Sequence, residues 1–523
     1  MTQELKRLLG SPAERQGFLE AIRACLPAVH FERISRIFQL LDGLLSLLEQ
    51  KNLSIAKLRQ LCFGATTESA RNVCGKQPAG DQRKAKAKGH GRNSHRHYTG
   101  ARRVRVSHPT LKAGQRCPDC TKGKLRPRKD PAVAITVTAQ PPVGAVIHEM
   151  EQLRCDTCGK LFTAPTPAEA GVEKYDVSVG VMVGLMRYGS GMPFYRLERL
   201  QKSLGVPLPA SVQWEQAYRV AQDLQPVYEH LIQQAAQASV VFSDDTGMRV
   251  SSLRKEIQSQ EKPKRTGIFT SGIVGEVENH SVTLFFTGRD HAGENLAAVL
   301  DRREAQRAPP LHMCDGLAQN APKGHVTVDC QCNVHARRGF VEVEGSFPEE
   351  CRRVVESFSA IYRVEAQAKA DGLSAEERLG VHQTHSQPVM EKLHSWFTEL
   401  IDGKKVEPNS GLGGAIAYMQ ARWTELTQFL RVPGAPMDNN SAERILKMAI
   451  LHRKNSLFYR TQRGADVGDL FMSVVQTCRS NGVNPFDYMM AVVRNAAQAK
   501  AHPARWLPWN YQTALAEQAA LSA

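Results

Sequence analysis

The stretch SVVFSDDT, residues 239–246, joins a short apolar run to two adjacent carboxylates. Its apolar residues at 240–242 predict a buried strand, and the run Leu311–Cys314 predicts another that ends directly before Asp315. Further strands are expected at 268–274, 282–286 and 326–328, with a helix at 292–302. Three successive strands, a helix and another strand describe an α/β core of the RNase H type.

Two acids of this core, Asp244 and Asp315, are candidate catalytic residues because adjacent strand ends bring them within metal-bridging distance. Carboxylate oxygens are the ligands that Mg²⁺ and Mn²⁺ prefer. Two such ions activate an attacking hydroxyl and stabilise a leaving oxygen in phosphoryl transfer. Asp245 is the alternative first ligand, and an aspartate before Gly316 is also a common turn sequence.

A third carboxylate, Glu443, lies in DNNSAERIL, residues 438–446, which opens an apolar-periodic helix. Its spacing from Asn440 is also that of a capping box, in which a glutamate satisfies the backbone at the start of its own helix. The catalytic interpretation requires instead that the first helical turn directs Glu443 toward Asp244 and Asp315. Both interpretations are open at this point.

Four cysteines predict a zinc ribbon. They form two Cys-x-x-Cys pairs, Cys117 with Cys120 and Cys155 with Cys158, and alternating apolar residues between the pairs predict short strands. Two thiolate pairs at this spacing make a tetrahedral Cys₄ site. Because all four positions are filled, no coordination site is left for a catalytic water, and the predicted Zn²⁺ is structural.

The chain has 523 residues and a formal charge of +16, so it should attract polyanions wherever that charge is clustered. One cluster lies at 81–106, a stretch too polar to fold alone, which predicts a solvated basic linker that grips DNA phosphates. No long apolar segment predicts a signal peptide or a membrane span, so a cytoplasmic, nucleoid-associated protein is expected. The candidate DNA-binding residues are Arg92, Arg96, Arg102, Arg103, Arg337, Arg338, Arg453 and Lys454.

Apolar residues at helical spacing between Ile34 and Cys62 predict a short coiled coil, and therefore a homo-oligomer, or else an amphipathic helix packed on its own domain. The stretch between the second and third acids is too long for the core and predicts a helical insertion. Near its start, Cys332 and His335 are expected to be structural or to brace the active site, rather than to form a second zinc site.

A basic stretch that follows the third acid, with His452, Phe458 and Tyr459 interleaved, is expected to face DNA phosphate or solvent. The expected divisions are a helical region with the coiled coil (1–64), a basic flexible linker (65–112), the zinc ribbon (113–165), a helical domain (166–238), the first part of the core (239–336), the helical insertion (337–430), the catalytic helix and end of the core (431–500) and a C-terminal tail (501–523).

Motifs along nearly the whole chain resemble those of the insertion-sequence-66 (TnpC-type) transposases. They are the four cysteines, PFYR at 193–196, DDT at 244–246, DG at 315–316, CNVHARR at 332–338, DNN at 438–440, AER at 442–444, RKN at 453–455 and NG at 481–482. The resemblance implies a DDE transposase whose triad carries over onto Asp244, Asp315 and Glu443, with Mg²⁺ or Mn²⁺ as cofactor. It also implies double-stranded DNA, as transposon ends and target, as the partner, and leaves room for small accessory transposition proteins.

Three positions depart from the family pattern. Asp245 stands where the family commonly has glutamate, Leu317 where an aromatic usually follows Asp-Gly, and Arg460-Thr461 where Gly-Ser is usual. The expected activity is hydrolysis of a phosphodiester at a transposon end followed by strand transfer. The alternatives are a catalytically silent, transposon-derived DNA-binding protein and an RNase H-like structure-specific nuclease.

Overall fold

The computed structural model of the chain describes residues 12–23, 27, 30–32, 34–35, 107, 109–120, 122–126, 133–134, 137, 140–154, 156, 158, 160–168, 173–261 and 263–522. Apart from positions 34 and 35, the predicted coiled coil lies outside these residues, as do the whole basic segment at 81–106, with Arg92, Arg96, Arg102 and Arg103, and Cys155. Two compact units divide the chain. The first contains Met1–Ala79, Arg337–Arg363 and Thr398–Gly414, and the second contains Gly80–Ala336, Val364–Phe397 and Ala415–Ala523.

A five-stranded sheet of order β5-β4-β3-β6-β7 forms the centre of the second unit. Its strands are β3 (Val240–Gly247), β4 (Phe269–Val277), β5 (His280–Gly288), β6 (Leu311–Cys314) and β7 (Val328–Gln331). The first three form an antiparallel meander, and β6 and β7 run parallel to β3. The strands expected from the apolar runs are therefore present.

Several boundaries differ from the expected ranges, and strand pairing explains two of the differences. Strand β3 continues through both aspartates, because Asp244 and Asp245 pair with Gly272 and Ser271 of β4. The last strand begins at Val328 rather than at position 326. Parallel pairing sets this start, since Val328 lies opposite Leu311, whereas Val326 is 78% exposed.

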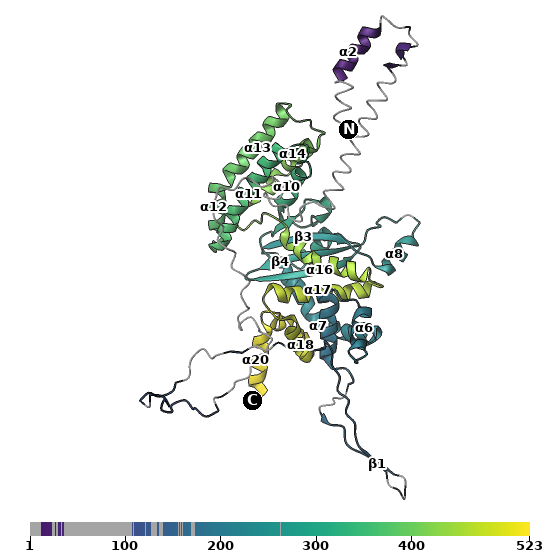
Figure 1. The fold of residues 1–523 in the computed structure, drawn as a ribbon, viewed down its shortest axis with the longest axis vertical. Helices are drawn as coiled ribbons and strands as arrows, with labels where there is room; N and C mark the ends of the chain where they lie inside the picture. The colour runs from purple at the N-terminus through teal and green to yellow at the C-terminus, as the bar shows by residue number, and fades with distance from the viewer. Residues whose placement is uncertain are drawn as a thin grey trace. The chain divides into compact units, whose positions relative to one another are not determined.

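Helices cover both faces of the sheet. Helices α7 (Ala210–Ala236) and α9 (Ala292–Leu300) contact one face, and α16 (Asn440–Ser456) contacts the other. The glycines of β4 make this packing close: a methyl group at Gly272 would lie 2.8 Å from Ile445 of α16. Figure 1 shows α16 and α17 beside β3 and β4. Residues at even positions of β4 therefore face α16, and their neighbours face α9.

Helix α17 (Gln462–Ser480) covers the outer edge of the sheet by donating and accepting side-chain hydrogen bonds along β5. Asp469, Ser473, Thr477 and Asn481 accept hydrogen bonds from the backbone N–H groups of Thr287, Phe285, Thr283 and Ser281, at 2.6, 2.9, 3.0 and 3.2 Å. Helical residues four positions apart are separated by about 6 Å along the helix axis. Strand residues two positions apart are separated by about 6.7 Å along the strand. The two spacings match well enough to satisfy an edge that would otherwise expose unpaired N–H groups.

We expect Thr477→Val to destabilise the protein by about 1–3 kcal/mol, because it leaves the buried Thr283 N–H without an acceptor. Urea unfolding, with amide exchange at Thr283 as the local readout, measures this. Thr384→Val is the matched control: its hydroxyl is exposed and donates only to Gly380 of its own helix, so the change should stay within about 0.5 kcal/mol. Equal unfolding midpoints for the two variants would contradict the edge-satisfying role.

The remaining elements of the second unit are mainly helical. They include β1 (Gln152–Arg154), β2 (Leu161–Thr163), α5 (Val177–Gly184), η3 (Leu185–Gly189), α6 (Phe194–Ser203), α8 (Ser251–Gln258), η4 (Ala318–Asn320), α12 (Ala375–His385), α15 (Trp423–Leu426), η5 (Gln428–Leu430), α18 (Pro485–Arg494), α19 (Ala496–Ala501), η6 (Pro503–Trp506) and α20 (Tyr511–Ser522). Helix α2 (Pro12–Arg23) belongs to the first unit, while α10 (Asn333–Val341), α11 (Pro348–Ala370), α13 (Gln387–Asp402) and α14 (Gly411–Ala421) contribute to both. In the first unit Val341, Cys351 and Val355 pack together. Among the described helices, none is both long and apolar enough to cross a membrane.

Candidate active site

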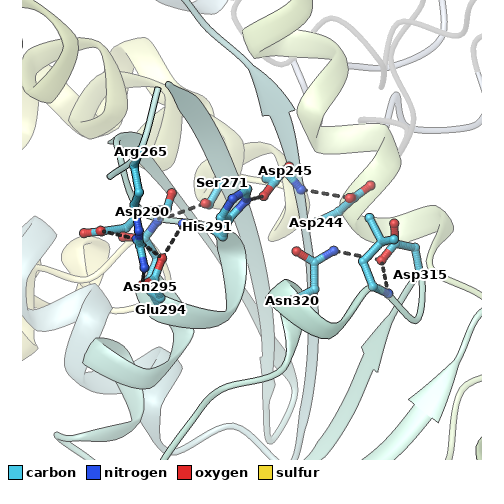
Figure 2. A network of polar contacts seen from close by, with 11 residues as sticks. Asp244, Asp245, Arg265, Ser271, Asp290, His291, Glu294, Asn295, Asp315 and Asn320 are labelled. Carbon is cyan, nitrogen blue, oxygen red and sulfur yellow. Dashed lines mark hydrogen bonds and ion pairs between the residues drawn. The ribbon is translucent and has the colours of Figure 1, made fainter. Parts of the chain in front are cut away.

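The two adjacent acids of β3 point to opposite faces of the sheet. Asp244 pairs with Gly272 and shares its face, which α16 covers. Asp245 points the other way, where its Oδ2 lies 2.8 Å from Nδ1 of His291 at the start of α9. Figure 2 shows Asp244 on the side of Asp315, and Asp245 turned toward His291. The geometry therefore separates the two candidate first ligands.

Asp315 follows the end of β6, next to β3 in the sheet. Its Oδ1 accepts hydrogen bonds from the Leu317 N–H at 3.1 Å and from Asn320 Nδ2 at 2.8 Å, which fixes the carboxylate. Gly316 turns the chain with φ +83°, and a methyl group there would lie 2.7 Å from Oε1 of Gln331. Both the backbone conformation and the available space therefore require glycine at position 316.

Glu443 lies in the first turn of α16, but it does not cap that helix. The N-cap residue is Asn439 rather than Asn440, and the Asp438 carboxylate accepts the hydrogen bond from the Asn440 N–H. Oε1 of Glu443 is buried without a hydrogen-bond partner. The capping-box alternative is therefore wrong, because the residue that would have to serve as N-cap is already inside the helix.

Asn439 fixes α16 against the strand that carries Asp244. This fully buried side chain donates from Nδ2 to the Ser243 carbonyl at 3.0 Å, and its backbone N–H donates to Cys332 Sγ at 3.3 Å. The buried Asn333 donates in turn to the Met437 carbonyl, two residues before Asn439. These bonds set where the first turn of α16, and hence Glu443, stands relative to β3.

Burial and neighbouring charges both change the pKa of Asp244. The pKa of Asp244 is raised to about 7, mainly by burial. The negative charges of Asp315 and Glu443 contribute to the rise, as does that of Asp245. The Asp245 N–H donates to the Asp244 carboxylate at 2.8 Å and opposes it. The charges of Asp315, Asp245 and Glu443 thus all contribute to the raised pKa of Asp244.

A second group of metal-ligand types shares Glu443. Among the described residues, Cys332, His335 and Glu443 are the three whose ligand atoms all lie within 4.8 Å of one another. Burial raises the pKa of the Cys332 thiol to about 11. The backbone N–H groups of Asn439, His335 and Val334 donate to its sulfur and partly lower that pKa. The expectation that this pair braces the active site agrees with its position beside Glu443.

A backbone turn carries Cys117 and Cys120, the first cysteine pair of the predicted zinc ribbon. The Cys117 N–H donates to the Gly123 carbonyl at 2.7 Å, and residues 116 and 124 form a β-bridge. Backbone N–H groups of Gly123 and Lys122 hold the pKa of Cys120 below its ordinary value. Strands β1 and β2 pair antiparallel on either side of the turn that carries Cys158. The Cys₄ site itself stays a prediction, since Cys155 lies outside the described residues.

The basic stretch that begins in the last turns of α16 is only partly exposed. His452 and Tyr459 are buried and stack on each other, and burial lowers the pKa of His452 to about 3, so the expectation that both face DNA or solvent is wrong. Lys454 is exposed. Arg453 donates to the Gly247 carbonyl at the end of β3 and so braces that strand. Arg337 and Arg338, on α10, are half-buried.

A cavity of about 430 Å³ beyond the end of β3 was not predicted from the sequence. Arg249, Arg254 and the half-exposed Phe458 line it together with Ile257 and Ile268. Among the residues that the structure describes, no carboxylate pairs with either arginine. Residues from 248–258, 266–268 and the distant Phe458 build this cavity, so no local sequence signal identifies it.

Comparison with known proteins decides the family. The model of the transposase IS66 family matches residues 175–467, more than half of the chain and the whole of the sheet. The chain belongs to the IS66 family of transposases. This confirms the resemblance seen in the sequence motifs and gives the chain a transposase role.

Three similar proteins of Sinorhizobium fredii (strain NBRC 101917 / NGR234) carry no functional description. The uncharacterized protein y4hP is 25% identical over 71% of this chain and 69% of its own length. The uncharacterized protein y4jD is 27% identical over 70% of this chain and 72% of its own length. The uncharacterized protein y4qI is 23% identical over 63% of this chain and 61% of its own length. The functional assignment of the IS66 chain therefore depends on its family and its site.

Proposed function

We propose that this IS66 family member is the DNA transposase of an insertion sequence, with Asp244, Asp315 and Glu443 as the catalytic carboxylates. The observation that carries the proposal is their convergence: residues from a central strand, the end of its parallel neighbour and the first turn of α16 share one field of negative charge. A buried carboxylate whose pKa is raised as strongly as that of Asp244 is typical of a functional site.

The sheet supports an RNase H-like core. An antiparallel meander of β5, β4 and β3, followed by a helical crossover to β6 and then β7 parallel to β3, is the topology of that fold. In this arrangement a first acid on the central strand lies beside a second acid at the end of its neighbour. Residues 337–430 would then be an insertion between the second and third acids.

The donor set fits Mg²⁺ or Mn²⁺. Asp315 uses Oδ1 to accept two hydrogen bonds, while Glu443 Oε1 has no hydrogen-bond partner among the described residues. Oxygen donors and a concentration of negative charge are what hard divalent ions select. When bound at such a cluster, two ions activate the attacking oxygen and stabilise the leaving oxygen of an in-line displacement.

The protein's own residues position the reaction. Leu317 N–H and Asn320 hold Asp315, and Asn439 fixes the helix that carries Glu443, so the carboxylates are in place before DNA binds. Water attacks phosphorus at the transposon end and releases a 3′ hydroxyl. That hydroxyl then attacks a target phosphodiester, displaces its 3′ oxygen and joins the strands without a covalent protein intermediate.

We expect DNA to contact the arginine-lined cavity and also basic segments that lie outside the described residues. Four residues along β3 separate Asp244 from the arginine-lined cavity, roughly 13 Å. Arg249 and Arg254 would therefore hold DNA phosphates close to the reacting bond. The sequence adds the basic segment at 81–106, Arg337, Arg338 and Lys454, and the zinc ribbon as a docking module. A homo-oligomer that pairs two transposon ends in the nucleoid, with or without accessory proteins, completes the proposal.

A paired-end assay tests this function. Purified full-length protein, labelled transposon-end DNA and a supercoiled target plasmid are incubated with Mg²⁺, and products are resolved for nicking and for joining. We expect both nicked ends and end-to-target joints. Nicking without joining would identify a nuclease, and end binding without nicking would identify a silent DNA-binding protein. Either result would contradict the proposed transposase.

A further inference from the structure

Three ligand atoms of different chemistry face one another where α10 and α16 begin. They are Sγ of Cys332, a ring nitrogen of His335 and a carboxylate oxygen of Glu443, all within 4.8 Å of one another. Nδ1 of His335 lies 3.7 Å from Oε1 of Glu443. Cys332 is fully buried, and the other two side chains are about one third exposed or less. Two helix starts thus bring a sulfur, a nitrogen and an oxygen donor to one point.

The nitrogen and the oxygen of this pair have no hydrogen-bond partner among the described residues. Nδ1 of His335 and Oε1 of Glu443 are both buried without a hydrogen bond, and 3.7 Å is too long for one between them. Leaving a buried polar atom unsatisfied costs about 1–3 kcal/mol. An ion bound by both atoms would satisfy them together.

The sulfur is already surrounded by donors suited to a thiolate. Cys332 Sγ accepts a hydrogen bond from the Asn439 N–H at 3.3 Å and lies at the start of α10, where backbone N–H groups carry partial positive charge. A helix-capping role accounts for these contacts of the sulfur. It does not account for the two unpartnered atoms that face it.

The spacing fits a tetrahedral ion. Nitrogen and oxygen ligands bind Zn²⁺ at about 2.0–2.2 Å and sulfur at about 2.3 Å, which places ligand atoms roughly 3.3–3.7 Å apart. The measured 3.7 Å between the histidine nitrogen and the carboxylate oxygen lies at the edge of this range. A set of thiolate, imidazole and carboxylate selects Zn²⁺ over Mg²⁺, because soft ligands disfavour hard ions.

We propose that Cys332, His335 and Glu443 form a binding site for a thiophilic divalent ion such as Zn²⁺, separate from the Cys₄ ribbon. Glu443 belongs both to this site and to the carboxylate cluster with Asp244 and Asp315. An ion held by the sulfur and the imidazole therefore competes for Glu443 and inhibits Mg²⁺-dependent cleavage. This inhibitory consequence, unlike the binding site itself, rests on the proposed function.

Cobalt titration of the full-length, metal-stripped protein tests the binding site directly, because Co²⁺ bound to thiolate absorbs light and fills zinc sites. We expect the parent to bind about one Co²⁺ more per chain than Cys332→Ser or His335→Ala. Serine can still accept the Asn439 hydrogen bond, so the fold should be kept. Cys330→Ser, at a buried cysteine two residues away, is the matched control and should bind as the parent does. Equal Co²⁺ stoichiometry and equal thiolate absorption in the parent and Cys332→Ser would overturn the proposal.

A second readout separates this site from the proposed function. Zn²⁺ added to Mg²⁺-dependent cleavage should inhibit the parent at least tenfold more than Cys332→Ser, each measured against its own activity without Zn²⁺. Equal inhibition would refute the competition for Glu443. If the parent binds no extra Co²⁺ but still cleaves DNA, the binding site is refuted and the proposed transposase function is not. If the parent binds the extra Co²⁺ but cleaves DNA without any metal ion, the site at Cys332, His335 and Glu443 is supported. The metal-dependent catalytic role of the three carboxylates is then refuted.

Discussion

Asp244→Asn, Asp315→Asn and Glu443→Gln should each lower Mg²⁺-dependent cleavage of transposon-end DNA by on the order of 10³-fold or more. Each change replaces a charged oxygen donor with a neutral one in a cluster where the three acids act together. The losses should not add, since one missing ligand already disables the shared site. Binding to end DNA at matched salt should stay close to that of the parent.

Asp245→Asn is the internal control for this series. It changes the same functional group one residue away, but that side chain lies on the opposite face of β3 and contacts His291 rather than the cluster. We expect a loss of less than about tenfold, well below that of the triad variants. Full activity in Asp244→Asn together with collapse in Asp245→Asn would move the first ligand by one residue. Full activity in Glu443→Gln would remove that residue from the triad.

A large effect on stability should come from the charge of Asp244 in the metal-free protein. Its folded pKa is about 7, above its ordinary value of 3.8, so folding favours the protonated form. Below pH 3.8 the carboxyl is neutral in both states and costs nothing. As the pH rises from 3.8 to 7 the unfolded chain ionises first, and stability is lost until it levels off above pH 7.

Asp244→Asn should therefore stabilise the metal-free protein at pH 8 by on the order of 4 kcal/mol, and by much less at pH 5. Thermal unfolding with chelator at the two pH values measures the difference. Asp402→Asn, at an exposed position of α13, should show no such pH dependence. Mg²⁺ should recover the lost stability of the parent at pH 8 and should do little for Asp244→Asn. A gain that is equal at both pH values would show that ionisation of Asp244 is not its cause.

Local sequence patterns were enough for the elements of the core and for the choice of candidate acids. Apolar runs identified the strands because a buried strand needs consecutive apolar residues, and they missed the extension of β3 through Asp244 because pairing with β4 sets that boundary. Asp315-Gly316 was identifiable because the turn needs a residue that tolerates positive φ. The order of motifs was enough for the family.

The tertiary structure alone decided which acids meet. Side-chain alternation along β3 separates Asp244 from Asp245, but only the packing of α16 on one face of the sheet determines which of them joins Glu443. It also decided that Glu443 does not cap its helix, since that depends on Asn439 bonding to a strand nearly two hundred residues earlier. The bonds from α17 to the edge of β5 and the meeting of Cys332 with His335 and Glu443 arise likewise between distant segments. Periodicity reports the nearest neighbours of a residue along the chain, whereas these contacts exist only once the helices have packed on the sheet.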